Sequence, residues 1–185
     1  MGLFTLHTRD TAHWRALVTA AEASVESCLE DELESYLVMV LLRYARNNST
    51  SHLAKQAAAI QSADPANAEL LREAGDRCLV IAGLMADQAL ELGMPVRYFV
   101  ETGRHAYQEV ARRTRNPFFQ RLSEQFVVLM DVLQVMRNLD SDELAVDLLS
   151  AYDQWQDTGS QYAFRLLRGA TRGALPSPQR SERRH

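Results

Sequence analysis

Glu101 and His105 stand four residues apart in the segment Glu101-Thr-Gly-Arg-His105, which predicts a helix. Residues at this spacing share one helical face, so the carboxylate and the imidazole could bind one metal ion. Di-metal carboxylate bundles use a Glu-x-x-His spacing on two helices and further Glu residues on two others. Here the spacing is four, and no second pair occurs. A site holding iron or manganese is therefore the alternative, and an exposed intrahelical pair is the simpler interpretation. The acids that could complete such a site are Glu34, Glu69, Glu73, Asp76, Asp87, Glu124 and Asp131.

A second polar group interrupts an apolar segment. Asp76 and Arg77 directly precede the run from Leu79 to Met85, so one or both should be buried. A buried charge must be paired and hydrogen-bonded, or it costs several kcal/mol. We expect an acid of the first helices to pair with Arg77. The bases expected to pair with Asp76 are Arg43, Arg46 and Arg104.

Two interpretations of this polar group remain open. The first is a buried network that fixes the register of the helices, which we favour. The second is a polar site lining a ligand pocket, with Asp76, Arg77 and Arg104 as its candidate residues.

Glycines within the predicted helices raise a related question. Gly75 and Gly83 lie on one predicted helix and Gly103 on the next. Glycine costs about 1 kcal/mol relative to alanine inside a helix, so something should offset it. Close approach of a neighbouring helix is the usual reason, and a bound flat ligand is the rarer one. If the two helices cross at the glycines, a narrow cavity bordered by Asp76, Arg104 and His105 is a hypothesis.

The charged residues exclude some function classes. The net charge is −4, which argues against a nucleic-acid surface. Nineteen arginines against one lysine could indicate bidentate recognition of phosphate or carboxylate groups, but the codon bias of a GC-rich genome is the interpretation we favour, and we expect a bacterial source. Six acids and no base lie between Glu22 and Glu34, whereas six arginines lie between Arg97 and Arg121. We expect these two regions to face each other or a partner. No phosphate-binding loop, nucleophile elbow or HExxH zinc motif occurs.

Helices must position all of these residues. Apolar spacings of three and four predict one helix from Trp14 to Val25 and another from Leu33 to about Arg46. Asp64-Pro65 and Asn116-Pro117 are helix-start patterns ahead of two central helices, Ala66–Leu92 and Phe118–Asn138. The remaining predicted helices cover about residues 51–61, 95–113, 140–155 and 160–167, with Asp140 and Glu143 as a capping box.

The predicted fold is all-α, a single compact bundle of six to seven helices over residues 1–168, followed by a flexible Arg-rich tail over 169–185. No sustained period-two alternation predicts a strand. The N-terminus lacks the pattern of a secretory signal, and no apolar run is long enough to cross a membrane. Cys28 and Cys78 form no disulfide framework, which favours a reducing compartment such as the cytoplasm.

The function predicted from these patterns is that of a non-enzymatic cytoplasmic protein, an adaptor or regulator that acts through protein–protein contacts. Its partner is another protein or a second copy of the chain, as in a homodimer; neither a membrane nor a nucleic acid is expected. The alternative is a helical metal-carboxylate protein or a small-ligand enzyme with its site near Glu101 and His105.

Overall fold

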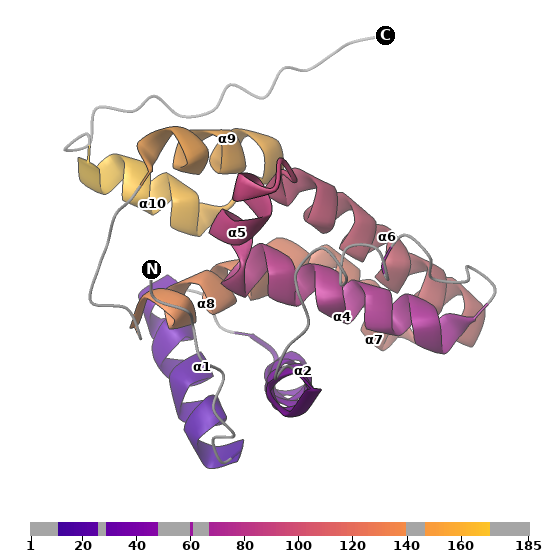
Figure 1. The fold of residues 1–185 in the computed structure, drawn as a ribbon. Coiled ribbons are helices and arrows are strands. Elements are labelled where there is room, and N and C mark those ends of the chain that lie inside the picture. Colours follow the sequence, from indigo (N-terminus) through magenta and orange to yellow (C-terminus); the bar gives the residue numbers. More distant parts are fainter. Residues whose placement is uncertain (1–10, 26–28, 48–59, 61–66, 140–146, 171–185) are drawn as a thin grey trace, which may run out of the picture.

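The computed structural model describes residues 11–25, 29–47, 60, 67–139 and 147–170, and the described residues form an all-α fold (Figure 1). They contain nine helices and no strand. The helices are α1 (Thr11–Val25), α2 (Asp31–Asn47), α4 (Ala68–Leu84), α5 (Ala86–Glu91), α6 (Val96–Thr114), α7 (Pro117–Glu124), α8 (Phe126–Leu139), α9 (Leu148–Thr158) and α10 (Gln161–Ala170). The predicted fold class is confirmed.

Helix α4 lies at the centre of the core. Every residue from Cys78 to Leu84 is buried, as expected of a segment that is apolar on all sides. Helices α6 and α8 are its main neighbours, and α6 runs antiparallel to α4, as Figure 1 shows. Helices α9 and α10 form a hairpin that packs on α8 and the start of α6, and α1 covers another side of α8.

Each of the two predicted central helices is broken once, which corrects the expected helix count. The segment Ala66–Leu92 divides into α4 and α5 at Met85, which has φ −125° and ψ 21°. The segment Phe118–Asn138 divides into α7 and α8 at Gln125, which has φ −90° and ψ 8°. The N–H group of each break residue still donates to the carbonyl four residues earlier. Apolar periodicity does not detect such breaks, because the apolar stripe continues on both sides.

The start of α7 agrees with the sequence, whereas α4 and α9 start later than predicted. The side chain of Asn116 accepts a hydrogen bond from the N–H of Phe118 at 3.0 Å, and Pro117 occupies the first turn of α7. Helix α4 starts later than the predicted Ala66, because Asn67, with φ −98° and ψ 110°, is its N-cap and accepts from the N–H groups of Glu69 and Leu70. The predicted starts at Asp64 and Asp140 lie outside the described residues, as does the predicted helix 51–61 apart from Ile60.

The C-terminal hairpin extends further than predicted. Helix α9 begins after Asp147, whose side chain accepts from the N–H of Leu149 at 3.0 Å, and it ends at Gly159 with φ 74°. Helix α10 continues through Gly169 to Ala170, so these two residues are helical rather than part of the predicted tail. Residues 171–185 lie outside the described part. None of the described helices combines the length and the apolar character needed to cross a membrane.

Candidate functional site

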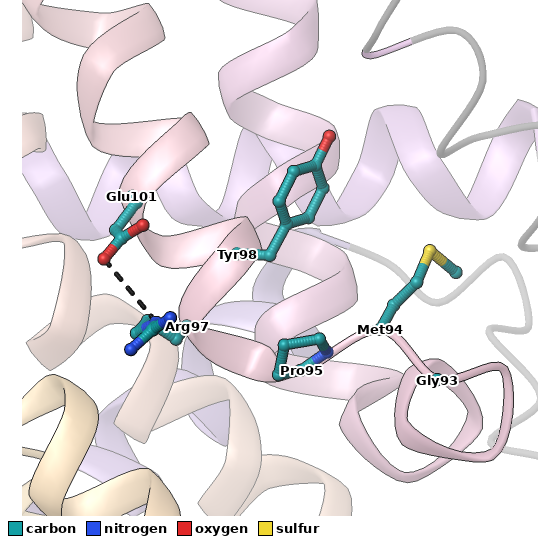
Figure 2. A pocket seen from close by; sticks show the side chains of 6 residues that line it. All are labelled: Gly93, Met94, Pro95, Arg97, Tyr98 and Glu101. Carbon is teal, nitrogen blue, oxygen red and sulfur yellow. Dashed lines mark ion pairs between the residues drawn. The ribbon is translucent and has the colours of Figure 1, made fainter.

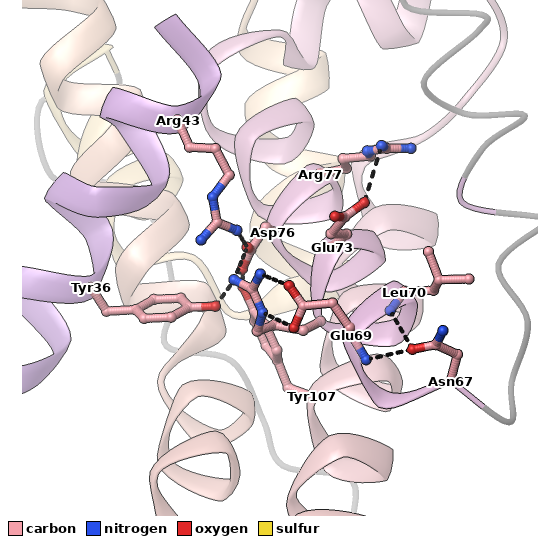
Figure 3. Close-up of polar contacts among 10 residues, drawn as sticks. Tyr36, Arg43, Asn67, Glu69, Leu70, Glu73, Asp76, Arg77 and Tyr107 are labelled. Carbon is pink, nitrogen blue, oxygen red and sulfur yellow. Dashed lines mark hydrogen bonds and ion pairs between the residues drawn. The ribbon is translucent and has the colours of Figure 1, made fainter. Parts of the chain in front are cut away.

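Asp76 is the centre of a buried polar cluster that joins three helices (Figure 3). Its side chain is on α4, and the residue is 6% exposed. Its Oδ1 atom accepts hydrogen bonds from the hydroxyls of Tyr36 on α2 at 2.7 Å and Tyr107 on α6 at 2.8 Å. Its Oδ2 atom accepts from Arg43 on α2 at 3.1 Å and from Arg72, one turn earlier on α4, at 3.2 Å. Each carboxylate oxygen therefore has two donors.

The electrostatics of the cluster follow from burial. Burial raises the pKa of the Asp76 carboxyl, and the two tyrosine hydroxyls and two guanidinium groups oppose that shift. Burial, together with the Asp76 charge, raises the pKa of Tyr36 and Tyr107 well above 10, so both remain protonated donors. The arrangement leaves the carboxylate enclosed by its own donors, which favours a register-fixing network over a ligand pocket.

The cluster includes three residues that were not predicted to belong to it. Arg72 lies four residues before Asp76 and also contacts Glu69, so its helical spacing could have indicated it. Tyr36 and Tyr107 are distant in sequence, and no local pattern identifies them as partners of Asp76. The expected pairing with Arg43 is confirmed.

The other candidates of this group lie elsewhere. Arg77 contacts Glu73 on its own helix at 3.5 Å, so the expected pairing with an acid of the first helices is wrong. Successive residues of a helix differ in direction by about 100°, which turns Arg77 away from the Asp76 cluster. Arg104 is exposed on α6, and other donors occupy both oxygens of Asp76. The side chain of Arg46, the third expected base, lies outside the described residues.

Glu101 and His105 are both exposed on α6. Glu101 forms an ion pair with Arg97, with 3.7 Å between Oε1 and Nε, as Figure 2 shows. Across the described ranges, no group of three or more His, Cys, Asp or Glu side chains is placed to hold a metal ion. The structure therefore adds no third ligand to this pair, and a metal site there stays a prediction.

The glycines mark close helix contacts, as expected. A Cβ atom at Gly103 would lie 2.4 Å from the Phe126 ring and 2.8 Å from the Cβ of Cys78. A Cβ atom at Gly75 would lie 2.6 Å from the Tyr107 ring. These rings occupy the space next to the two glycines, so close helix packing accounts for Gly75 and Gly103 without a bound flat ligand. Burial also raises the pKa of the Cys78 thiol to about 12, which makes it a poor nucleophile.

Asp131 forms a second buried polar centre, on α8, and is 2% exposed. Its Oδ1 atom accepts from the Ser160 hydroxyl at 2.6 Å, and its Oδ2 atom accepts from the N–H groups of Gln161 at 2.9 Å and Tyr162 at 3.1 Å. Asp131 thus caps the start of α10 from another helix. From the sequence it was named only as one acid that could complete a metal site; its place between apolar residues indicated burial, but not this partner.

Close to Asp131, Gln134 continues the polar connection from α8. Its Nε2 atom donates to the carbonyl of Ala82 on α4 at 2.9 Å. Gln154 on α9 donates to the side-chain oxygen of Gln134 at 2.8 Å and to the Ser160 hydroxyl at 3.2 Å. Asp131 and Gln134 therefore fasten the α9–α10 hairpin to the core.

The two regions of opposite charge face each other through one arginine. Arg121 on α7 forms ion pairs with Glu30, at 3.2 Å, and with Glu32 at the start of α2. The expectation that the acidic and Arg-rich regions meet is confirmed at this contact. Arg104, Arg112 and Arg115 of the same Arg-rich region are exposed.

An apolar surface lies where α5 turns into α6, and we call it the α5–α6 corner. Its exposed leucines are Leu90, at 49%, and Leu92, at 55%. The residues that follow them in the chain open an exposed cavity of about 350 Å³, which is lined by Gly93, Met94, Pro95, Arg97, Tyr98 and Glu101 (Figure 2). The α5–α6 corner is defined by Leu90, Leu92, Met94, Pro95 and Tyr98. The sequence did not predict this surface, because Leu90 and Leu92 were expected to lie in the last turn of one long helix.

Comparisons with protein-family models, with curated proteins and with solved structures find no match to this chain. Its function must therefore be inferred from the geometry of the described residues.

Proposed function

We propose that this protein is a non-enzymatic adaptor or regulator of the cytoplasm that binds another protein through the α5–α6 corner. The observation that supports this proposal is the exposed Leu92 directly ahead in the chain of an open, mainly apolar cavity, with the half-exposed Leu90 two residues earlier. Exposed apolar groups that gather at one place on a surface are typical of protein-binding sites.

The α5–α6 corner offers apolar surface that a partner can cover. Complete burial of a leucine side chain contributes about 1.5–3 kcal/mol relative to complete exposure. Leu90 and Leu92 are each about half exposed, so a partner that covers both gains roughly half of that amount from each. A few such side chains commonly dominate the binding energy of an interface.

The backbone of the α5–α6 corner is held in place. The N–H group of Gly93 donates to the carbonyl of Leu90 at 2.8 Å, and that of Met94 donates to the carbonyl of Ala89 at 2.9 Å. Gly93 has φ +73°, which favours glycine. Pro95 occupies the N-cap position of α6 with an extended backbone, and the buried Phe99 anchors the next turn. A preorganised surface loses little conformational entropy on binding.

The buried polar groups give less support to an enzyme. The carboxylates of Asp76 and Asp131 are enclosed by donors from the chain itself. A catalytic acid or base needs hydrogen-bond access to a substrate atom. Neither cluster provides that access in this geometry.

Site-specific photo-crosslinking in cells that produce the full chain tests this proposal. A benzophenone amino acid replaces Leu92 in one variant and Gln120, exposed on α7, in a matched control. We expect a discrete protein adduct from position 92 that is absent from position 120 and that disappears when Leu90 is changed to Asp. Adducts with another protein and with a second copy both support binding at the corner. The same pattern at both positions, or no adduct at position 92, contradicts it.

A further inference from the structure

The α5–α6 corner has a predominantly acidic rim. Glu91 is exposed between the two exposed leucines, and Glu101, 71% exposed, lines the cavity. Asp157, at the end of α9, contributes a third carboxylate that is 40% exposed. Arg97 is the single base that lines the cavity within the described residues. Glu101 and Asp157 against Arg97 therefore leave the rim with one more negative than positive charge, and Glu91, two residues before Gly93 in the chain, is a further exposed acid.

The ion pairs within the rim are long. Arg97 lies 3.7 Å from Glu101 and 3.8 Å from Asp157, beyond ordinary hydrogen-bonding distance. Exposed pairs of this kind contribute little to stability. The carboxylates can therefore exchange Arg97 for a cation of a partner at small cost. By contrast, Asp87 is paired with Arg137 at 3.0 Å and adds no net charge to the surroundings.

We propose that the α5–α6 corner binds a basic amphipathic segment of a partner protein, with leucine-like side chains on one face and Lys or Arg beside them. This inference rests on the proposed function and adds the chemical class of the partner. The apolar side chains cover Leu90 and Leu92 and enter the cavity, while the cations contact Glu101 and Asp157. Complementary charge around an apolar centre supplies specificity.

The same charges argue against a second copy as the occupant. A two-fold contact places the same surface of each copy against the other, so two acidic rims would meet. Like charges brought together at an interface are unfavourable. A basic segment instead neutralises the rim, and this difference makes the two occupants separable by experiment.

Fluorescence anisotropy with three designed peptides and the full chain tests the inference. Each labelled peptide has about 15 residues, long enough to form a helix, and all share one pattern. The first contains Leu and Lys, the second Leu and Glu, and the third Ala and Lys. We expect the Leu/Lys peptide to bind at least about tenfold more tightly than the other two, a difference of about 1.4 kcal/mol.

Substitutions then test where the peptide binds and separate the apolar from the electrostatic contribution to its affinity. Leu92→Asp should weaken binding of the Leu/Lys peptide by about tenfold or more, whereas Leu70→Asp, at an exposed leucine of α4, should not. The double variant Glu101→Gln and Asp157→Asn should reduce the preference for Leu/Lys over Leu/Glu, and Glu124→Gln on α7 serves as its control.

Each contrary result has a distinct meaning. If both Leu peptides bind equally and Leu92→Asp weakens both, the corner binds protein without charge selection, so this inference fails and the proposed function stands. If Leu92→Asp changes no peptide's binding, both fail at this corner. A dimer detected by light scattering and dissociated by Leu92→Asp overturns the inference in favour of a second copy.

Discussion

Tyr107 on α6 makes two contacts with α4, one with Asp76 and one with the adjacent Gly75. Its hydroxyl donates to Oδ1 of Asp76 at 2.8 Å, and its ring lies so close to Gly75 that a Cβ atom there would be 2.6 Å from it. The hydroxyl reaches the carboxylate only because the glycine lets the ring approach. One hydrogen bond and one steric contact thus define the same register between the two helices.

The first prediction concerns the charge of Asp76. Asp76→Asn retains the size of the side chain but removes the charge that compensates Arg43 and Arg72, and it places an amide donor among four other donors. Breaking a buried ion pair typically costs about 3–5 kcal/mol. We expect the free energy of unfolding to fall by about 3 kcal/mol, measured by urea denaturation followed by circular dichroism.

Tyr36→Phe is the matched control for this prediction. It removes one donor and leaves Asp76 with Tyr107 and both arginines. The expected loss is about 1 kcal/mol, the usual net contribution of one hydrogen bond. If Asp76→Asn costs no more than Tyr36→Phe, the ionised carboxylate is not the centre of the network.

The second prediction concerns Gly83. A Cβ atom there would lie 2.4 Å from the Cβ of Leu133, which is fixed to the α8 backbone and cannot retreat as the end of a flexible side chain can. Gly83→Ala gains about 1 kcal/mol in helix propensity, but overpacking a core costs about 1–3 kcal/mol. Because the two helices must separate, we expect a cost near the upper end of that range, hence a net loss of up to about 2 kcal/mol and a lower thermal midpoint; Gly83→Leu should prevent folding.

Gly169→Ala is the matched control for Gly83→Ala. Gly169 lies in the last turn of α10, and a Cβ atom added there would meet open space, with no neighbouring atom within 4 Å. The same chemical change should therefore raise stability by up to about 0.5–1 kcal/mol. Equal effects of the two substitutions on the thermal midpoint would show that α4 and α8 do not constrain Gly83.

How far the sequence predicts this structure depends on the range of the interaction. Local patterns predicted the helical class, the cap formed by Asn116 and Pro117, and the burial of Asp76, because each depends on neighbours within about one turn. The breaks at Met85 and Gln125 were missed, since an apolar stripe continues through both. The spacing of apolar residues predicts which side chains are buried far better than it predicts which residues they contact.

The polar clusters show the same limit. Arg43 could be expected near Asp76, because a buried carboxylate needs a base and few were available on the neighbouring helices. No such reasoning identifies Tyr107, whose contact depends on how α6 crosses α4. The contact between Asp131 and the start of α10 likewise arises from the packing of a hairpin on a helix. The α5–α6 corner was not predicted, because apolar spacing does not show which leucines stay exposed at the end of a helix.

The third prediction concerns the backbone of Arg115. This residue ends α6 with φ 54° and ψ 31°, a left-handed conformation that costs roughly 1–2 kcal/mol for a residue with a Cβ atom. Glycine adopts it without that cost but loses more entropy on folding. We expect Arg115→Gly to be more stable than Arg115→Ala by about 0.5–1 kcal/mol in urea denaturation. The alanine variant removes the same charge, so the comparison isolates the backbone; equal stability would mean that the turn carries no strain.

The fourth prediction concerns the pH dependence of stability through Asp131. Burial raises the pKa of its carboxyl in the folded chain, although the Ser160 hydroxyl and the N–H groups of Tyr162 and Gln161 oppose that shift. The folded state thus binds the proton more strongly than the unfolded chain, where the pKa is about 3.9. Its contribution is fully present below that value and is lost as pH rises through the higher folded pKa.

Asp131→Asn removes this titration while retaining one acceptor oxygen for the start of α10, and other groups such as Asp76 titrate equally in both proteins. We therefore expect the stability of the native chain relative to the variant to decrease as pH rises from about 4 toward 7, by about 1.4 kcal/mol for each unit of pKa shift. Urea denaturation of both proteins across that range measures the difference. A relative stability that instead increases with pH would mean that the donors from Ser160 and α10 outweigh burial, so that Asp131 acts as a charged cap.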